Sequence, residues 1–502
     1  MHVSRYLTGG AVLEDRPLLN SQHILPSGIG KDSFVVRVCN SKEHKMNYGQ
    51  PTERLGTEKT SHLLFRMAVP AVIAQVVNLL YNIVDRIYIG HIPEIGVPAL
   101  TGVGLVTPLL MLMNAFAMFI GSGGAPLASI ALGKQDKERA DRIVGVCFFG
   151  LVVLSILLTV CLQIVAPQLL RFFGASDVTL PYALEYSRIY ISGTIAVMLT
   201  MGMNPFISGQ GFAGTAMLTT VIGAAINIAL DPLLIFTFHM GVKGAAIATV
   251  FSQVISAVWI VVFLSSRKPT IRLRRSNIRS DWPLLGQCTA LGVSSLIMMG
   301  TESLLSIIFN RSLSIYGGDL AVGAMTIITA VNAIVFLPLQ GVAQGVQPIM
   351  SYNYGAGEYR RVRESFRLAL IVNVMYAVVC WMLIQFATKT IAGLFTNDAA
   401  LRDYTVWAMR IYFACIFTLS FQTTCQYGFI ALGEARLSLY MAILRKIVLL
   451  IPLILILPRF LSDQVFAVFI AEPVSDVIAA LVTTVLFFLT MRRTMGLSSD
   501  PQ

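Results

Sequence analysis

Long apolar runs alternate with short polar segments along most of this chain. Each run is about 20 residues long, the length that a helix needs to cross the hydrocarbon core of a bilayer. This pattern predicts an all-α integral membrane protein. The predicted membrane helices lie near residues 66–89, 99–122, 142–166, 185–207, 215–238, 243–264, 283–310, 321–346, 364–388, 402–430, 437–457 and 464–490.

Lysine and arginine are unevenly distributed over the connecting segments. Four lie in residues 134–142, six in 265–282, four in 358–367 and three in 433–446, whereas the intervening connections carry zero to two each. Because basic loops stay on the cytoplasmic side of a membrane, this alternation predicts that both termini are cytoplasmic. The net charge of +11 is then explained by topology, and we expect no nucleic-acid binding.

The first 58 residues differ from the rest of the chain. They are polar, mixed in charge and without the apolar core of a signal peptide. We expect a disordered cytoplasmic extension over residues 1–58. Met46 is followed by a stretch typical of a natural amino terminus, which makes it a candidate start and residues 1–45 a candidate over-extension.

The two halves of the apolar region repeat each other. NLLYNIVDR at 78–86 aligns with SLLSIIFNR at 303–311 at an offset of 225, and residues 123–139 align with 345–361 at an offset of 222. Six helices per half is an even number, so the halves relate by an axis along the membrane normal. We predict two pseudo-symmetric six-helix bundles, with lobes over 59–275 and 276–502 and the substrate between them.

Composition and motifs narrow the class of protein. The chain is 56% hydrophobic and 13% charged, which is typical of a polytopic membrane protein. Its seven cysteines show no CxxC spacing, and there is no GxxxxGK[ST], HExxH or GxSxG motif. We therefore expect no enzyme, no ATP-driven pump, no cofactor and no metal centre beyond a coupling ion.

Acidic residues inside apolar runs are candidate functional residues, because a carboxylate in the membrane costs several kcal/mol unless it is neutralised or solvated. Asp231 lies in such a run, four residues after Asn227, so the two share a helix face. From the predicted helix starts, Asp85 and Asp231 both lie in the outer half of the bilayer. Two structural alternatives remain: Asp231-Pro232 as a helix cap, and an interfacial ion pair of Asp85 with Arg86.

The sequence resembles the multidrug and toxic compound extrusion (MATE) family, in its branch of bacterial drug exporters. The resemblance covers roughly residues 58–492. The segments that carry it are MAVPAVIAQVVNLLYNIVDRIYIG, IGAAINIALDPLLIF, GVKGAAIATVFSQ, PLQGVAQGVQPIMSYNYGAG and AEPVSDVIAA. The resemblance implies two six-helix bundles around a central cavity, and export of organic cations in exchange for sodium ions or protons.

The resemblance also implies a coupling-ion site in the amino half. Asn227 and Asp231 match the family's N-x-x-x-D cation site, and the match extends to Asp85 and Thr249. Carboxylate, amide and hydroxyl oxygens are suitable ligands for sodium. A carboxylate in a low-dielectric pocket also suits a proton carrier.

A polar row lies on the first predicted helix. Gln75, Asn78, Asn82 and Asp85 follow the spacing i, i+3, i+7 and i+10, so all four share one face. We interpret the first three as cavity lining, with hydrogen bonds that merely join helices as the alternative. Methionines such as Met118 and Met201 are candidates for an adaptable drug-binding surface, or else for ordinary packing.

Polar residues of the carboxyl half are candidates for cargo binding or a relay. Glu302, Gln422 and Gln426 are predicted to line the substrate cavity. Arg410 needs a carboxylate partner inside the membrane, and the candidates are Glu472 and Asp476. Some family members bind the coupling ion in this half with an acid on the tenth membrane helix. The tenth predicted helix of this chain, 402–430, has no acid apart from Asp403 at its entrance.

We therefore expect a secondary antiporter that exports cationic amphipathic compounds in exchange for Na⁺ or H⁺ by alternating access. It is expected to act as a monomer in the lipid bilayer of the plasma (inner) membrane. One alternative is a flippase of lipid-linked precursors, which should line its cavity with several arginines or lysines. Another is an exporter of one specific metabolite.

Overall fold

The computed structural model describes residues 51–93 and 95–495, and all regular structure in these residues is helical. The helices are α1 (Pro51–Thr57), α2 (Thr60–Gly90), α3 (Gly96–Gly133), α4 (Lys137–Phe172), α5 (Leu180–Ser192), α6 (Thr194–Ser208), α7 (Ala213–Pro232), η1 (Leu233–Thr237), α8 (Gly241–Ser265), η2 (Arg275–Asn277), α9 (Trp282–Gly355), α10 (Tyr359–Phe395), α11 (Ala399–Tyr412), α12 (Thr418–Ala431), α13 (Ala435–Ile443), η3 (Leu444–Leu450), α14 (Ile451–Ile456), η4 (Leu457–Arg459) and α15 (Gln464–Thr494). The candidate start Met46 and the lobe boundary at the carboxyl terminus lie outside the described residues. The last part of the extension expected to be disordered, Pro51–Thr57, forms helix α1.

Nine helices of the described chain are long and apolar enough to cross a membrane, or ten if the bent pair α5 and α6 forms one span. The chain bends by 58° between α5 and α6, and the two helices together correspond to the predicted span 185–207. α11 and α12 together cover the predicted span 402–430. These helices make the chain a multi-pass membrane protein.

The 74-residue helix α9 folds back on itself and contains two predicted spans, 283–310 and 321–346. A Cβ added at Gly123 of α3 would lie 1.9 Å from the carbonyl oxygen of Cys288, and one at Gly133 would lie 1.9 Å from that of Tyr352. The two glycines are about 15 Å apart along α3, whereas a straight α9 would separate Cys288 and Tyr352 by about 96 Å. The turn is at Gly318, whose φ of 63° and ψ of −158° suit only glycine.

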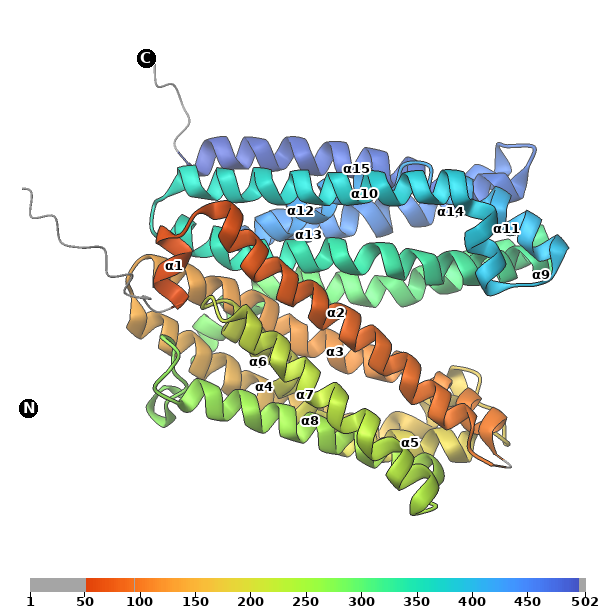
Figure 1. The fold of residues 1–502 in the computed structure, drawn as a ribbon, viewed down its shortest axis with the longest axis horizontal. Helices are drawn as coiled ribbons and strands as arrows, with labels where there is room; N and C mark the ends of the chain where they lie inside the picture. Colours follow the sequence, from red (N-terminus) through yellow and green to blue (C-terminus); the bar gives the residue numbers. More distant parts are fainter. Residues whose placement is uncertain (1–50, 94, 496–502) are drawn as a thin grey trace, which may run out of the picture. The chain divides into compact units, whose positions relative to one another are not determined.

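The helices form two lobes, the amino lobe (α2–α8) and the carboxyl lobe (α9–α15), joined by close packing of α3 against α9. In Figure 1 the lobes meet at the end of the bundle that carries α1, here called the α1 end, and they diverge toward the opposite end. The close approach at Gly133 and Tyr352 belongs to this α1 end. The arrangement confirms the predicted two-bundle fold.

Helix α1 braces the two lobes where they meet. The Thr52 hydroxyl donates to the carbonyl of Gln210 in the amino lobe at 2.9 Å. The side-chain amide of Asn353 in the carboxyl lobe donates to the carbonyl of Leu55 at 2.8 Å. Leu55 itself is fully buried between these contacts. A segment expected to be disordered therefore holds the α1 end closed.

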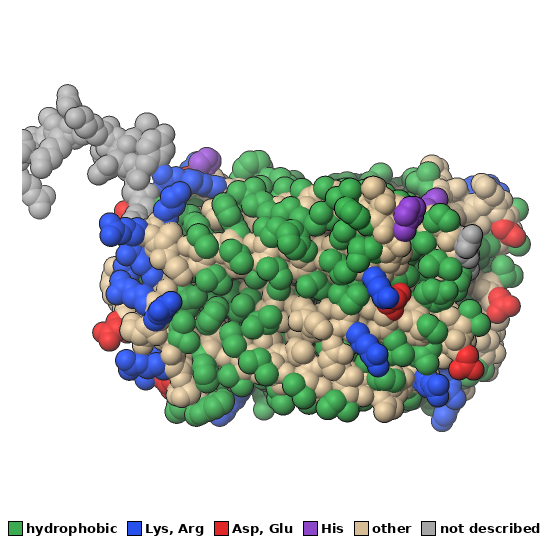
Figure 2. All heavy atoms as spheres, turned by 90° about the horizontal axis from the view of Figure 1, so that it is seen from below, with side chains coloured by type: hydrophobic (Ala, Val, Ile, Leu, Met, Phe, Trp, Pro, Cys, Tyr) green, Lys and Arg blue, Asp and Glu red, His purple; other side chains and the backbone are tan. Residues whose placement is uncertain are grey.

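The surface has the charge distribution of a membrane protein. Hydrophobic side chains cover the middle of the face in Figure 2, whereas most lysines and arginines in this view gather at the α1 end. Exposed apolar residues of the described chain, such as Ile156, Ile164 and Phe386, are suited to contact lipid. The asymmetry of the basic residues is the pattern from which membrane orientation is inferred.

Candidate functional site

A cavity of about 220 Å³ lies between the two lobes. Gln75 and Asn78 of α2 line it, as predicted, together with Asn204 of α6, Gln344 of α9 and Tyr427 of α12. The Gln75 amide donates to the Gln344 side-chain oxygen at 3.1 Å, so one hydrogen bond crosses the cavity from lobe to lobe. This polar row therefore both lines a cavity and joins two helices.

The rest of the cavity wall combines apolar side chains with uncharged polar ones such as Ser122, Thr220 and Gln347. Met118 and Met201, which we singled out from the sequence, line it with Met67 and Met217. Among the described residues, those that line this cavity include no Asp, Glu, Lys or Arg. The wall suits compounds with a large apolar body and a few hydrogen-bonding groups.

Asn82, unlike Gln75 and Asn78 of the same helix, does not line the cavity. Its side-chain amide donates to the carbonyl of Asn78 at 2.6 Å, it is exposed, and it is not among the lining residues. The prediction that Asn82 lines the cavity is therefore wrong in this structure. The bond to its own helix satisfies the amide without any cavity contact.

The four residues predicted as a coupling-ion site come together in the amino lobe. Asp85 of α2, Asn227 and Asp231 of α7 and Thr249 of α8 are all buried. The Asn227 amide donates to Asp231 Oδ1 and to the Thr249 hydroxyl, both at 3.3 Å. The carboxyl groups of Asp85 and Asp231 lie close enough to act on each other electrostatically. We call this set the amino-lobe cluster.

Three oxygens of the amino-lobe cluster are buried and have no hydrogen-bond partner: Asp85 Oδ1, Asn227 Oδ1 and Asp231 Oδ2. A buried polar atom without a partner costs about 1–3 kcal/mol, and more when it is charged. Two adjacent carboxyl groups add mutual repulsion if both are ionised. The arrangement therefore favours uptake of a proton or of a cation with oxygen ligands.

The described part of the structure shows neither an N-cap at Asp231 nor a direct ion pair at Asp85, although Arg86 acts on Asp85 electrostatically. α7 continues through Asp231 to Pro232 and leads into the π-helix η1, which has no side-chain cap. Asp231 is therefore not an N-cap, and its Oδ1 bonds Asn227 instead. The ion pairs between described residues include none between Asp85 and Arg86.

Three tyrosines that the sequence analysis missed surround the amino-lobe cluster. Tyr81 and Tyr186 lie beside the Thr249 hydroxyl, and Asp85 is within electrostatic range of both and of Tyr190. The rings of Tyr186 and Tyr190 stack with centroids 6.0 Å apart. Tyr81 lies four residues before Asp85 on the same face of α2, which was the available signal.

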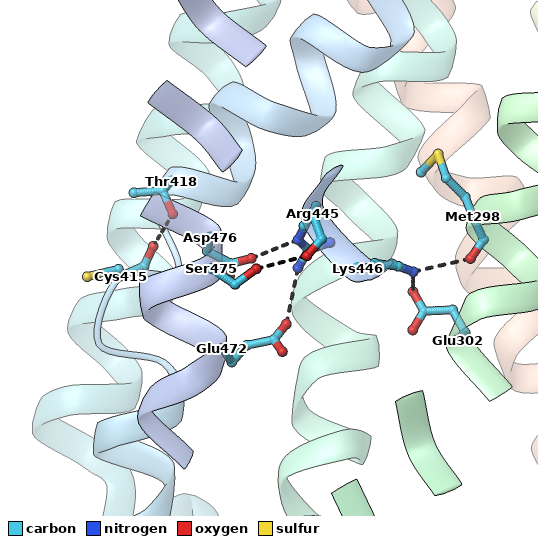
Figure 3. Close-up of polar contacts among 9 residues, drawn as sticks. All are labelled: Met298, Glu302, Cys415, Thr418, Arg445, Lys446, Glu472, Ser475 and Asp476. Carbon is cyan, nitrogen blue, oxygen red and sulfur yellow. Dashed lines mark hydrogen bonds and ion pairs between the residues drawn. The ribbon is translucent and has the colours of Figure 1, made fainter. Parts of the chain in front are cut away.

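A second set of charged residues, here called the carboxyl-lobe cluster, lies on α9, η3 and α15 (Figure 3). Arg445 Nε lies 2.7 Å from Asp476 Oδ1, and its Nη2 lies 3.1 Å from Glu472 Oε1. The neighbouring Lys446 forms an ion pair with Glu302 and donates to the carbonyl of Met298 at 3.2 Å. The lobe thus carries its own cations.

The predicted partner of Glu472 and Asp476 was wrong. Arg410 is exposed on α11, and its Nε donates to the Thr388 hydroxyl at 3.3 Å. Arg445 is the arginine that binds both carboxylates. Arg445 was expected in the basic connection 433–446, whereas it lies in η3, within the eleventh predicted span.

Gln422 and Gln426 line a separate pocket of about 20 Å³ in the carboxyl lobe, next to Arg445 and Lys446, and not the central cavity. The Gln426 amide donates to the carbonyl of Ser438 at 2.8 Å. The side-chain oxygens of both glutamines are buried without a partner. Their predicted place in the substrate cavity is therefore corrected to this neighbouring pocket.

Two six-helix lobes with a cavity between them define a duplicated, multi-pass membrane protein. The MatE family model matches residues 70–233 and 295–456, one segment in each lobe. The chain belongs to this family, which confirms the resemblance inferred from sequence.

Relatives and solved structures agree with this membership. Multidrug export protein MepA of Staphylococcus haemolyticus (strain JCSC1435) is 22% identical over 424 residues, which cover 83% of this chain and 91% of the relative. A crystal structure of MATE in the bent conformation superposes with a TM-score of 0.84 at 23% identity, covering 90% of this chain and 99% of that chain. The outward-facing conformation of a multidrug resistance MATE family transporter of the MOP superfamily superposes with a TM-score of 0.80 at 24% sequence identity. This alignment covers 89% of this chain and 97% of that chain. At these identities the structures support the fold.

Proposed function

We propose that this protein is a secondary antiporter that exports amphipathic organic cations in exchange for Na⁺ or H⁺. The observation that carries the proposal is the amino-lobe cluster, with three buried oxygens lacking partners around two adjacent carboxyl groups. The names of relatives such as MepA support export of drugs as the direction of transport. The activity is movement across the membrane without a chemical conversion.

The amino-lobe cluster offers two ways to take up a coupling ion. A sodium ion would bind the free oxygens of Asp85, Asn227 and Asp231, which are the hard ligands that it prefers. A proton would instead be shared by the two carboxyl groups. The described residues contain no set of three or more His, Cys, Asp or Glu side chains placed to hold a metal ion, so a sodium site would depend on the Asn227 amide.

The lobes provide a means of alternating access. α1 and the packing of α3 on α9 close the α1 end, whereas the lobes diverge at the other end. The basic residues at the α1 end support a cytoplasmic orientation of that end and of both termini, in the plasma (inner) membrane. A single chain encloses the cavity, which supports a functional monomer.

The energetics of exchange are adequate. A membrane potential supplies about 2.3 kcal/mol per charge per 100 mV. An ion shifts the equilibrium between the two states only by as much as it binds them differently. Exchange therefore requires that the ion bind the amino-lobe cluster more tightly in one state than in the other.

The cavity wall argues against the flippase alternative. A flippase of lipid-linked pyrophosphates should present several basic side chains to its cargo. No Lys or Arg of the described residues lines the central cavity, and both basic residues of the carboxyl-lobe cluster are paired with acids. Apolar and amide-bearing walls are better suited to amphipathic drugs.

The test is efflux of a fluorescent organic cation from proteoliposomes under an imposed proton gradient or an imposed sodium gradient. We expect one gradient to drive efflux of the wild type and neither to drive efflux of Asp231→Asn. Efflux that persists in Asp231→Asn would remove the coupling role of the amino-lobe cluster. Absence of efflux under both gradients in the wild type would point to a narrower metabolite exporter or a flippase.

A further inference from the structure

Lys446 is a buried cation, and the carboxylate with which it forms an ion pair is exposed. The Lys446 side chain is 6% exposed, whereas that of Glu302, with which it pairs, is 58% exposed. Removing a charge from water is costly, so the ammonium group depends on this carboxylate. An exposed carboxylate, in contrast, is open to competition from a cation that arrives from solvent.

The position of Glu302 along α9 can be related to the central cavity. Ser295 of α9 lines the central cavity, and its hydroxyl accepts a hydrogen bond at 2.8 Å from Ser122 of the amino lobe. Glu302 lies seven residues, or about two turns, further along the same face of α9. Glu302 therefore lies about 10 Å further along α9 than this cavity-lining serine, and its carboxylate is exposed outside the cavity lining.

Lys446 has a second carboxylate within reach of its field. Glu472 uses Oε1 to bind Arg445, and its Oε2 is buried without a hydrogen-bond partner. Glu472 also acts electrostatically on Lys446. Figure 3 shows Arg445 pointing toward α15 and Lys446 pointing toward Glu302 from successive positions of the π-helix η3. π-Helical turns of this kind are frequent at functional sites.

We propose that Glu302 is the docking point for the cationic group of the cargo, and that Lys446 is a tethered competitor that displaces it. The inference rests on the proposed function. When cargo binds Glu302, the charge of Lys446 is compensated by Glu472. The cluster then holds three carboxylates, two basic side chains and one cargo cation, so its charges cancel. When Lys446 returns to Glu302, the cargo is released. The structure holds the released arrangement, with Lys446 on Glu302.

The test is equilibrium binding of tetraphenylphosphonium to the purified full chain, compared among wild type, Lys446→Met, Lys446→Arg and Glu302→Gln. Lys446→Met should bind about tenfold more tightly because the competitor is gone, and Glu302→Gln about tenfold more weakly. Lys446→Arg should resemble the wild type. The double variant should be as weak as Glu302→Gln, because the competitor matters only where the carboxylate exists.

Transport separates this role from a structural one. Lys446→Met should lower both the concentration for half-maximal efflux and the maximal rate, since cargo binds well and leaves slowly. A folded Lys446→Met that binds no more tightly than wild type would overturn the inference and leave the antiporter intact. A wild type that neither binds nor exports the cation would overturn the proposed function, and this inference with it.

Discussion

The two lobes place polar clusters on corresponding helices but balance their charge in opposite ways. In the amino lobe, the first, fifth and sixth spans bring Asp85 and Asp231 together with an amide and a hydroxyl, and the ion pairs of the described residues include neither acid. In the carboxyl lobe, the same three spans bring three carboxylates together with Arg445 and Lys446. The carboxyl lobe supplies its own cations from the chain, whereas the proposed function requires that the amino lobe take up a cation from solution.

This difference separates coupling from structure. A cluster with unsatisfied oxygens is stabilised by whatever ligand completes it, so its state depends on ion concentration. A cluster whose charges are paired within the chain contributes to the stability of the fold. Removing one partner of such a buried pair lowers the free energy of unfolding strongly. Matched substitutions in the two lobes should therefore change stability and transport in different proportions.

The largest expected effect on stability is that of Arg445→Met. It would leave Glu472 and Asp476 buried without their shared cation, at a cost of about 3–5 kcal/mol. Thermal unfolding of the detergent-solubilised protein measures the loss. Arg410→Met is the control, since Arg410 is exposed and donates to the Thr388 hydroxyl, and the ion pairs of the described residues do not include it. Equal unfolding temperatures for the two variants would show that the pairing of Arg445 does not hold this lobe together.

Asp85→Asn should change stability in the opposite direction. It removes one of two adjacent carboxyl groups that lack a basic partner, so the sodium-free protein should be as stable as wild type or more stable by up to about 1 kcal/mol. Ion-driven efflux should nevertheless be lost. Asp476→Asn, which breaks a contact with Arg445, is the matched control and should destabilise. If Asp85→Asn destabilises as much as Asp476→Asn, the contrast between the lobes fails.

Sequence reasoning found one cluster and missed the centre of the other for physical reasons. Asn227 and Asp231 are four residues apart in an apolar run, so helical periodicity alone placed them on one face. Arg445 and Lys446 follow a basic loop and were attributed to topology. Their partners lie 27 to 144 residues away, and the π-helix that aims them leaves no mark in an α-helical pattern. The fold-back at Gly318 was predictable from spacing because an apolar run of that length cannot be one span.

Thr249→Val should weaken binding of the coupling ion and leave the stability of the fold unchanged. The hydroxyl of Thr249 accepts a hydrogen bond from Asn227 and lies beside Tyr81, so its loss leaves the amide less well oriented. A lost hydrogen bond of about 1 kcal/mol corresponds to a rise of roughly fivefold in the ion concentration for half-maximal efflux. Thr249→Ser keeps the hydroxyl and should stay close to wild type. A Thr249→Ser variant as impaired as Thr249→Val would assign the effect to packing.

The smallest effect should come from Ser475→Ala in the carboxyl lobe. The Ser475 hydroxyl donates to the backbone carbonyl of Arg445 at 2.9 Å and so fastens η3 to α15. Its removal should cost about 1 kcal/mol of unfolding free energy and leave the ion dependence of efflux unchanged. Ser155→Ala is the control, because that buried hydroxyl bonds only the carbonyl of Val152 in its own helix. If Ser475→Ala instead altered the ion dependence, the carboxyl-lobe cluster would take part in coupling, and the division between the lobes would need to be redrawn.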